Sequence, residues 1–243
     1  MECRLCEKEK KLIKAHAIPE AFFRLLRKGE TPPKLMTNIA GIHPKKSPIG
    51  VYDTGILCRE CEDKFESWDD YGIKVLINEI DTFKPIKDGS EIVAYYQDKY
   101  DYEKLKLFFI SILWRASVST QSFYSKVNLG HWEEIAKKHI LDENSGNGHE
   151  FSTVLSLFIS KSGRDKLAKT MLDPYMERWE HVNAYRVYLA GVVAYIKVDK
   201  RHLPNSLSSL MLREGKPLHI VCRDLESSND VKAMIAVVKG GHT

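Results

Sequence analysis

Cys3-Arg4-Leu5-Cys6 has a counterpart in Leu57-Cys58-Arg59-Glu60-Cys61, and these two stretches decide the fold of the first third of the sequence. Each contains a Cys-x-x-Cys pair, which supplies two thiolates from one tight turn. Two pairs together provide four soft ligands, enough to close a tetrahedral zinc site completely. The spacing therefore predicts that Cys3, Cys6, Cys58 and Cys61 bind one structural Zn²⁺ ion.

The second pair lies where two predicted elements meet. Residues 51–57 are expected to form a strand, and residues 60–80 a helix. The N-terminus of a helix favours thiolates electrostatically. A knuckle followed by a cysteine pair on the first turn of a helix is the layout of a treble-clef zinc finger. The apolar residues of the predicted helix recur at helical spacing: Phe65, Trp68, Ile73, Leu76, Ile77 and Ile80.

A histidine stands between the two cysteine pairs, in Ala15-His16-Ala17-Ile18-Pro19. Residues 11–18 alternate enough for a short strand, and Pro19 is suited to the first turn of a helix. The ordinary pKa of histidine lies near neutrality, so His16 is a candidate general base. The other interpretation is a polar histidine on a half-exposed strand.

The succession Cys-x-x-Cys, His-x-x-Pro and Leu-Cys-x-x-Cys, followed by a helix, resembles the zinc-stapled branch of the HNH nuclease superfamily, which has the ββα-metal fold. The resemblance covers roughly residues 1–80. It implies that His16 activates a water molecule to attack a phosphodiester. It also implies that one divalent cation, Mg²⁺ or Mn²⁺, stabilises the leaving oxygen.

Two positions depart from the pattern of that family. The position before the base is often Asp or His and binds the catalytic metal, but here it is Ala15, which cannot. The position after the second cysteine pair is often Asn or His, but here it is Glu62. A glutamate can bind Mg²⁺ through oxygen, so Glu62 is the candidate ligand of a catalytic metal, with Asp53 as a weaker one.

The pattern changes near Pro85, which divides the chain into a zinc-binding module at 1–85 and a body at 86–243. Hydrophobic residues make up 43% of the chain, enough to bury a full core. The expected fold class is α+β, with the treble-clef or ββα-metal module followed by a mixed α+β body. The body is predicted to contain strands at 91–97, 151–159, 184–189, 192–198 and 218–223, and helices at 102–117, 131–140 and 228–238.

Charge is unevenly distributed along the chain. The whole chain carries a formal net charge of +4. Residues 1–50 hold eleven Lys or Arg against five Asp or Glu, an excess compatible with a phosphate-backbone partner or with an ordinary solvated surface. The paired cysteines are typical of metal ligands in a reducing compartment, and no long apolar run is present. We therefore expect a cytoplasmic protein without a membrane-spanning segment.

Two functions remain open from the sequence. The first is an HNH-like, metal-dependent endonuclease that hydrolyses nucleic acid, with DNA as the expected substrate and phage defence as the setting that the analogy suggests. The second is a non-catalytic zinc protein that binds nucleic acid or a protein partner, and Ala15 favours it. In either case, residues 86–243 are expected to recognise the substrate or a partner.

Overall fold

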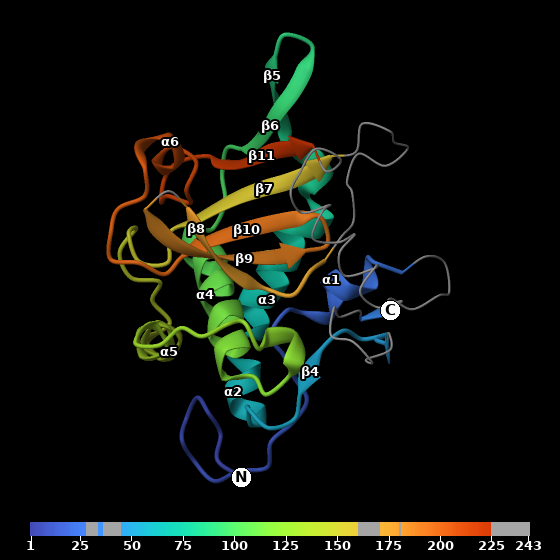
Figure 1. Ribbon diagram of the computed structural model, residues 1–243, viewed down its shortest axis with the longest axis vertical. Helices are drawn as coiled ribbons and strands as arrows, with labels where there is room; N and C mark the ends of the chain where they lie inside the picture. Colours follow the sequence, from blue (N-terminus) through green and yellow to red (C-terminus); the bar gives the residue numbers. More distant parts are fainter. Residues whose placement is uncertain (28–33, 36–44, 160–170, 180, 225–243) are drawn as a thin grey trace.

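The protein is described by a computed structural model at residues 1–27, 34–35, 45–159, 171–179 and 181–224. It combines helices with a seven-stranded sheet, so the predicted α+β class is confirmed (Figure 1). The predicted helix at 228–238 lies outside the described residues. No helix in the described ranges has both the length and the apolar character needed to cross a bilayer.

The large sheet forms the upper half of the molecule in Figure 1. Its strands run in the order β5-β6-β11-β7-β10-β9-β8, and only β11 and β7 are parallel neighbours. The long apolar runs of β7, β9 and β10 are buried along nearly their whole length, as expected for strands covered on both faces. The strands are β5 (Lys84–Asp88), β6 (Glu91–Gln97), β7 (Thr153–Ile159), β8 (Tyr175–Trp179), β9 (Val182–Leu189), β10 (Val192–Lys197) and β11 (Leu218–Asp224).

Helix α4 (Tyr102–Val118) is the central helix and lies against one face of the sheet (Figure 1). Its N-cap is Asp101, whose carboxylate accepts a hydrogen bond from the Lys104 amide at 3.0 Å. The helix is apolar nearly all round, which is typical of a helix inside a core rather than on a surface. Sequence reasoning predicted this helix at 102–117, and the prediction is confirmed.

Helix α3 (Glu66–Ile73) packs beside α4. Gly72 permits this close approach, because a Cβ atom at that position would lie 2.6 Å from the Phe108 ring. The predicted helix at 60–80 is broken: α2 (Arg59–Asp63) ends before α3 begins, and a π-helical turn follows at Lys74–Asn78. The break lets α2 hold the cysteines while α3 turns its apolar side towards α4.

The other elements at the N-terminal end are short. The strand predicted at 11–18 is reduced to β1 (Ala15–His16), and the strand predicted at 51–57 to β4 (Tyr52–Asp53); the two pair antiparallel. Pro19 precedes the helix that it was predicted to start. The remaining elements are α1 (Glu20–Arg24), β2 (Lys34–Leu35), β3 (Lys45–Lys46), α5 (Trp132–Asp142), α6 (Asn205–Ser208) and 3₁₀ turns at Ile80–Thr82 and Ser122–Tyr124.

One continuous core joins the N-terminal elements to the body. The Phe22 ring lies 6.1 Å from that of Phe108, and the Phe65 ring stacks on Trp114 at 6.4 Å, between ring centroids. Residues before and after the predicted boundary at 85/86 therefore share a hydrophobic interior. The division into two domains stays a prediction.

Asp53 fastens β4 to the segment that follows α4. Its Oδ2 accepts hydrogen bonds from the Thr120 amide at 2.6 Å and from the Ser119 and Thr120 hydroxyls, and its Oδ1 accepts one from Gly55. Burial raises the pKa of Asp53, but these hydrogen bonds outweigh it and hold the pKa below its ordinary value. The carboxylate is therefore stabilised in its charged form, although it lies inside the protein.

Replacing Asp53 by Asn is expected to lower the free energy of unfolding at pH 7 by about 2–4 kcal/mol, because buried donors lose a charged acceptor. Because the pKa of Asp53 is lower in the folded protein, its contribution to the free energy of unfolding is complete above the unfolded-state pKa of about 3.9. The contribution is lost as the pH falls through the lower pKa of the folded state. Urea titrations at pH 7 and below pH 4 measure both effects.

The matched control is Asp63→Asn, which removes an exposed carboxylate whose ion pair among the described residues is with Arg59 at 3.7 Å. This substitution is expected to change the free energy of unfolding by less than about 0.5 kcal/mol. Equal losses in the two variants would contradict the role given to Asp53.

Candidate functional site

Four thiols meet where the N-terminal segment lies against α2, the helix near the lower end of the molecule in Figure 1. The sulfur atoms of Cys3, Cys6, Cys58 and Cys61 all lie within 4.8 Å of one another. Cys6 is half-buried and the other three are buried. Cys58 is the N-cap of α2, as the treble-clef layout predicts. The two Cys-x-x-Cys pairs are thus brought together into a cluster that can hold a metal ion.

Backbone hydrogen bonds shape the knuckle around the first pair. The Cys3 amide donates to Lys8 O at 3.0 Å, and the Glu7 amide donates to Cys3 O at 2.8 Å. Glu7 takes a left-handed conformation, with φ at 56°, which closes the turn. The Arg4 amide donates to Ile56 O at 2.8 Å. The knuckle is therefore hydrogen-bonded to the chain that leads into the second pair.

The electrostatics of the cluster suit a cation. Burial raises the pKa of the Cys3 thiol, but hydrogen bonds from three backbone amides outweigh it and lower the pKa to about 7. Burial raises the pKa of both Cys58 and Cys61, and the neighbouring thiols raise that of Cys61 further. Four crowded sulfurs resist ionising together unless a positive charge lies among them. A tetrahedral Zn²⁺ fits this donor set and would supply that charge.

His16 lies on β1, and its half-buried ring is held in one orientation. Its Nε2 lies 2.9 Å from Ile49 O. The Tyr52 ring contacts it edge-on, at 5.9 Å between centroids. Burial lowers the pKa of His16, and the bond to Ile49 offsets only part of this effect. The neutral imidazole is therefore favoured, and Nδ1 has no hydrogen-bond partner among the described residues.

Glu62 lies beside His16 in the structure. Its carboxylate interacts with the backbone amide of His16 and with the charge of Arg115. Burial raises the pKa of Glu62, and these two interactions lower it only in part. Its Oε2 is buried and has no hydrogen-bond partner in the described part of the chain. The structure thus brings together the two residues that sequence reasoning selected for catalysis.

Neither Ala15 nor Asp53 offers a free ligand atom beside His16. Ala15 is fully buried and, as expected from the sequence, carries no ligand atom. Both oxygens of Asp53 are occupied by the hydrogen bonds that fasten β4. Glu62 is therefore the remaining candidate ligand beside His16.

Arg115 and Asp69 complete this site, and sequence reasoning missed both roles. Arg115 Nη1 donates to His16 O at 2.8 Å, and the same guanidinium binds the Asp69 carboxylate through two nitrogens. Burial lowers the pKa of Arg115, but Asp69 raises it further, so the guanidinium stays charged. An arginine within the mostly apolar stretch at 107–116 was the signal available in the sequence.

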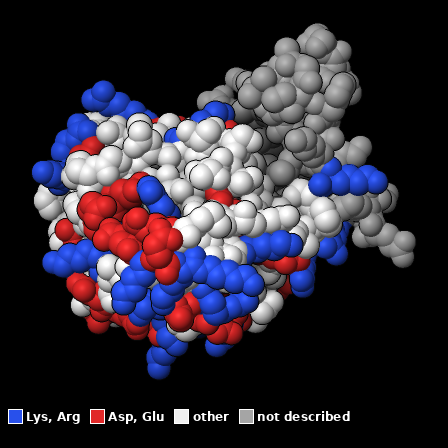
Figure 2. Space-filling view, turned by 90° about the horizontal axis from the view of Figure 1, so that it is seen from below, with Lys and Arg blue, Asp and Glu red and all other residues white. Residues whose placement is uncertain are grey.

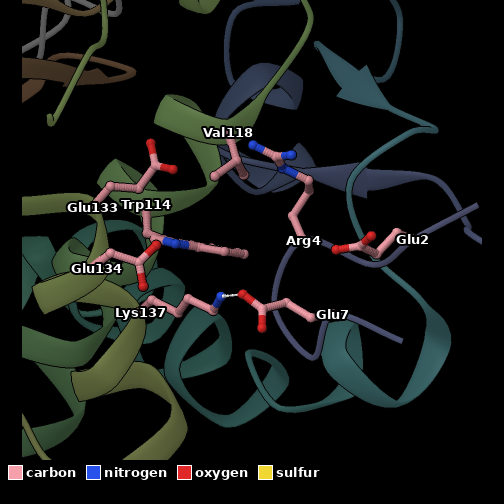
Figure 3. A pocket seen from close by; sticks show the side chains of 8 residues that line it. All are labelled: Glu2, Arg4, Glu7, Trp114, Val118, Glu133, Glu134 and Lys137. Carbon is pink, nitrogen blue, oxygen red and sulfur yellow. Dashed lines mark hydrogen bonds and ion pairs between the residues drawn. The ribbon is translucent and has the colours of Figure 1, made fainter. Parts of the chain in front are cut away.

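A cavity of about 120 Å³ lies between the N-terminal segment and helices α4 and α5 (Figure 3). Lys137 pairs with Glu7 across it. Trp114 is fully buried, and its Nε1 has no partner among the described residues. Carboxylates outnumber cations here, so the cavity does not favour a phosphate group. It is lined by Glu2, Arg4, Glu7, Trp114, Val118, Glu133, Glu134 and Lys137.

Comparisons with known proteins do not assign the chain to a family: no family model, curated protein or solved structure matches it.

The purified protein is expected to contain one Zn²⁺ per chain, measured by elemental analysis. Cys58→Ser removes one of four ligands and should both lose the metal and lower the melting temperature, because binding of structural zinc is coupled to folding. Cys222→Ser is the matched control, since Cys222 lies on β11, and it should keep both. Zinc retained at full stoichiometry in Cys58→Ser would contradict the four-thiol site.

Proposed function

We propose that the protein is a metal-dependent nuclease that hydrolyses phosphodiester bonds, with His16 as its general base. The observation that carries the proposal is the hydrogen bond between His16 Nε2 and Ile49 O. A carbonyl oxygen only accepts, so the ring proton is assigned to Nε2. Nδ1 then keeps its lone pair, and a neutral imidazole with a free lone pair can take a proton from water.

The position of Glu62 supports a metal at this site. Its buried Oε2, which has no partner among the described residues, is an oxygen ligand of the kind that Mg²⁺ and Mn²⁺ prefer. A bound divalent cation would neutralise the negative charge that develops on the leaving oxygen as the phosphodiester bond breaks. Glu62 would hold that cation, and His16 would orient and deprotonate the water.

Two exposed cations near His16 support a polyanionic substrate. Lys14 precedes β1, and its Nζ is 4.9 Å from the centre of the Tyr52 ring, which His16 also contacts. Arg27 donates to Pro48 O at 2.6 Å, next to the carbonyl that holds His16. This end of the molecule also carries acidic side chains, so its surface is mixed rather than uniformly basic (Figure 2). We therefore assign phosphate binding to these two residues rather than to a broad patch.

DNA is the substrate that we propose, and phage defence is the corresponding setting, both by analogy with the HNH nucleases. Ala15 favours a second candidate, a non-catalytic zinc protein that binds nucleic acid or a protein partner. With Ala15 in place of a ligand, Glu62 is left as a single carboxylate, whereas Mg²⁺ sites commonly use one or two together with substrate phosphates.

The decisive variant is His16→Ala. Loss of a general base is expected to reduce Mn²⁺- or Mg²⁺-dependent cleavage of DNA by about 10²–10⁴-fold. Cleavage of labelled single- and double-stranded DNA and of RNA measures it, with zinc content and melting temperature recorded in parallel. His131→Ala, which removes an exposed histidine before α5, is the control and should cleave at the rate of the unaltered protein.

Two results would refute the nuclease. The first is no metal-dependent cleavage of any of these substrates. The second is cleavage that persists unchanged in His16→Ala. Binding of nucleic acid without cleavage would support the non-catalytic candidate instead.

Lys14→Gln tests the proposed phosphate contact. Loss of one phosphate contact should weaken binding to every DNA sequence alike and reduce the slope of log K against log salt by about 0.7–0.9. Fluorescence anisotropy at several salt concentrations measures the slope in the His16→Ala background, where the DNA stays intact. Lys216→Gln, an exposed lysine in the turn before β11, should leave the slope unchanged.

A further inference from the structure

We propose that Arg115, held by Asp69, is a positioning residue that fixes the backbone of His16 and thereby the direction of its Nδ1. This inference rests on the proposed function, because it concerns the orientation of the proposed base. It also extends that function, since Arg115 belongs to α4 in the body of the protein rather than to the zinc-binding end.

Every donor of the Arg115 guanidinium is used. Nη1 donates to His16 O and to one oxygen of Asp69, both at 2.8 Å. Nη2 donates to the other Asp69 oxygen at 2.6 Å and to the Ser111 hydroxyl at 3.1 Å. Nε donates to Ser111 O at 3.3 Å. With five N–H groups and five acceptors, the plane of the guanidinium has one orientation.

The surroundings of the guanidinium prevent it from moving. The Arg115 side chain is fully buried, and its central carbon lies 4.6 Å from the centre of the Phe65 ring. Asp69 is anchored on α3, which packs directly against α4. His16 O is thus fixed relative to two helices of the core rather than to a surface loop.

Both polar groups of the His16 backbone face this network. Its carbonyl accepts from Arg115, and its amide interacts with Glu62. On the other side, the ring is held at Nε2 by Ile49 O. The histidine is therefore held at both its main chain and its ring, which is the condition for presenting Nδ1 in a constant direction.

Stability alone does not explain the arrangement. A buried ion pair is costly to desolvate, and well-packed apolar residues often serve a core equally well. Other bonds already fasten the neighbouring chain: the Ile18 amide donates to the Tyr124 hydroxyl at 3.4 Å, and Asp53 holds β4. Of these hydrogen bonds from the body of the protein, the one donated by Arg115 is accepted by the carbonyl of His16 itself.

The test compares Arg115→Lys and Asp69→Asn with the unaltered full-length protein. Lysine keeps the charge but lacks the planar fork, and asparagine keeps the shape of aspartate but not its charge. We expect kcat for DNA cleavage to fall about 10²-fold in each variant, as for a small misplacement of a catalytic group, while KM changes less than twofold. Arg213→Lys is the matched control, because Arg213 also donates to a backbone carbonyl, Ser208 O, and should keep full kcat.

A second readout does not depend on nuclease activity. Nitrogen NMR of protein labelled at its nine histidines, with the His16 signals assigned from His16→Ala, reports which ring nitrogen carries the proton. The unaltered protein should show the Nε2–H form alone, whereas Arg115→Lys and Asp69→Asn should show a mixture of the two neutral forms.

The outcomes separate the two proposals. If the unaltered protein cleaves nothing but the tautomer mixture appears in the variants, the nuclease fails and the positioning role stands. The positioning role is overturned if folded Arg115→Lys and Asp69→Asn keep the single Nε2–H form. It is also overturned if their loss of activity lies in KM alone, or if it disappears when rates are expressed per folded molecule.

Discussion

The meeting of two distant cysteine pairs is the constraint on which the rest of the structure depends. Bringing residues 3–6 to residues 58–61 closes a long stretch of chain, and the entropy of closure has to be offset by binding at the junction. Four sulfur atoms within 4.8 Å of one another provide that junction once a metal neutralises them. Closing the loop places α2 beside β1, and so places Glu62 beside His16.

A second constraint acts from the body of the protein. An arginine inside an apolar helix has to find acceptors for all its donors, because an unpaired buried charge is strongly unfavourable. Arg115 meets this requirement with Asp69, Ser111 and the carbonyl of His16. The same bonds that satisfy the arginine therefore connect α4, α3 and β1. A residue needed to complete the site is also one that the core cannot leave unpaired.

Local patterns in the sequence were enough to predict some of these features. Strand β6, the β9–β10 hairpin and helix α4 follow from apolar runs of the right length, and the cysteine spacing indicated the thiol cluster. Strands β5 and β8 were missed because many of their residues are polar and exposed, without a long apolar run. The Arg115–Asp69 pair joins residues 46 positions apart. Its geometry depends on how α3 packs on α4, which no local pattern encodes.

The two constraints together argue against treating the first 85 residues as a self-sufficient catalytic unit. The cysteine cluster determines where β1 lies, but the hydrogen bonds to the His16 carbonyl and to Asp53 Oδ2 come from α4 and the segment after it. A fragment ending at residue 85 would leave the His16 carbonyl without the guanidinium, and Asp69 would become a half-buried carboxylate without its cation. The proposed site is therefore composite: the cluster of four cysteines brings His16 and Glu62 together, and the body holds them in register.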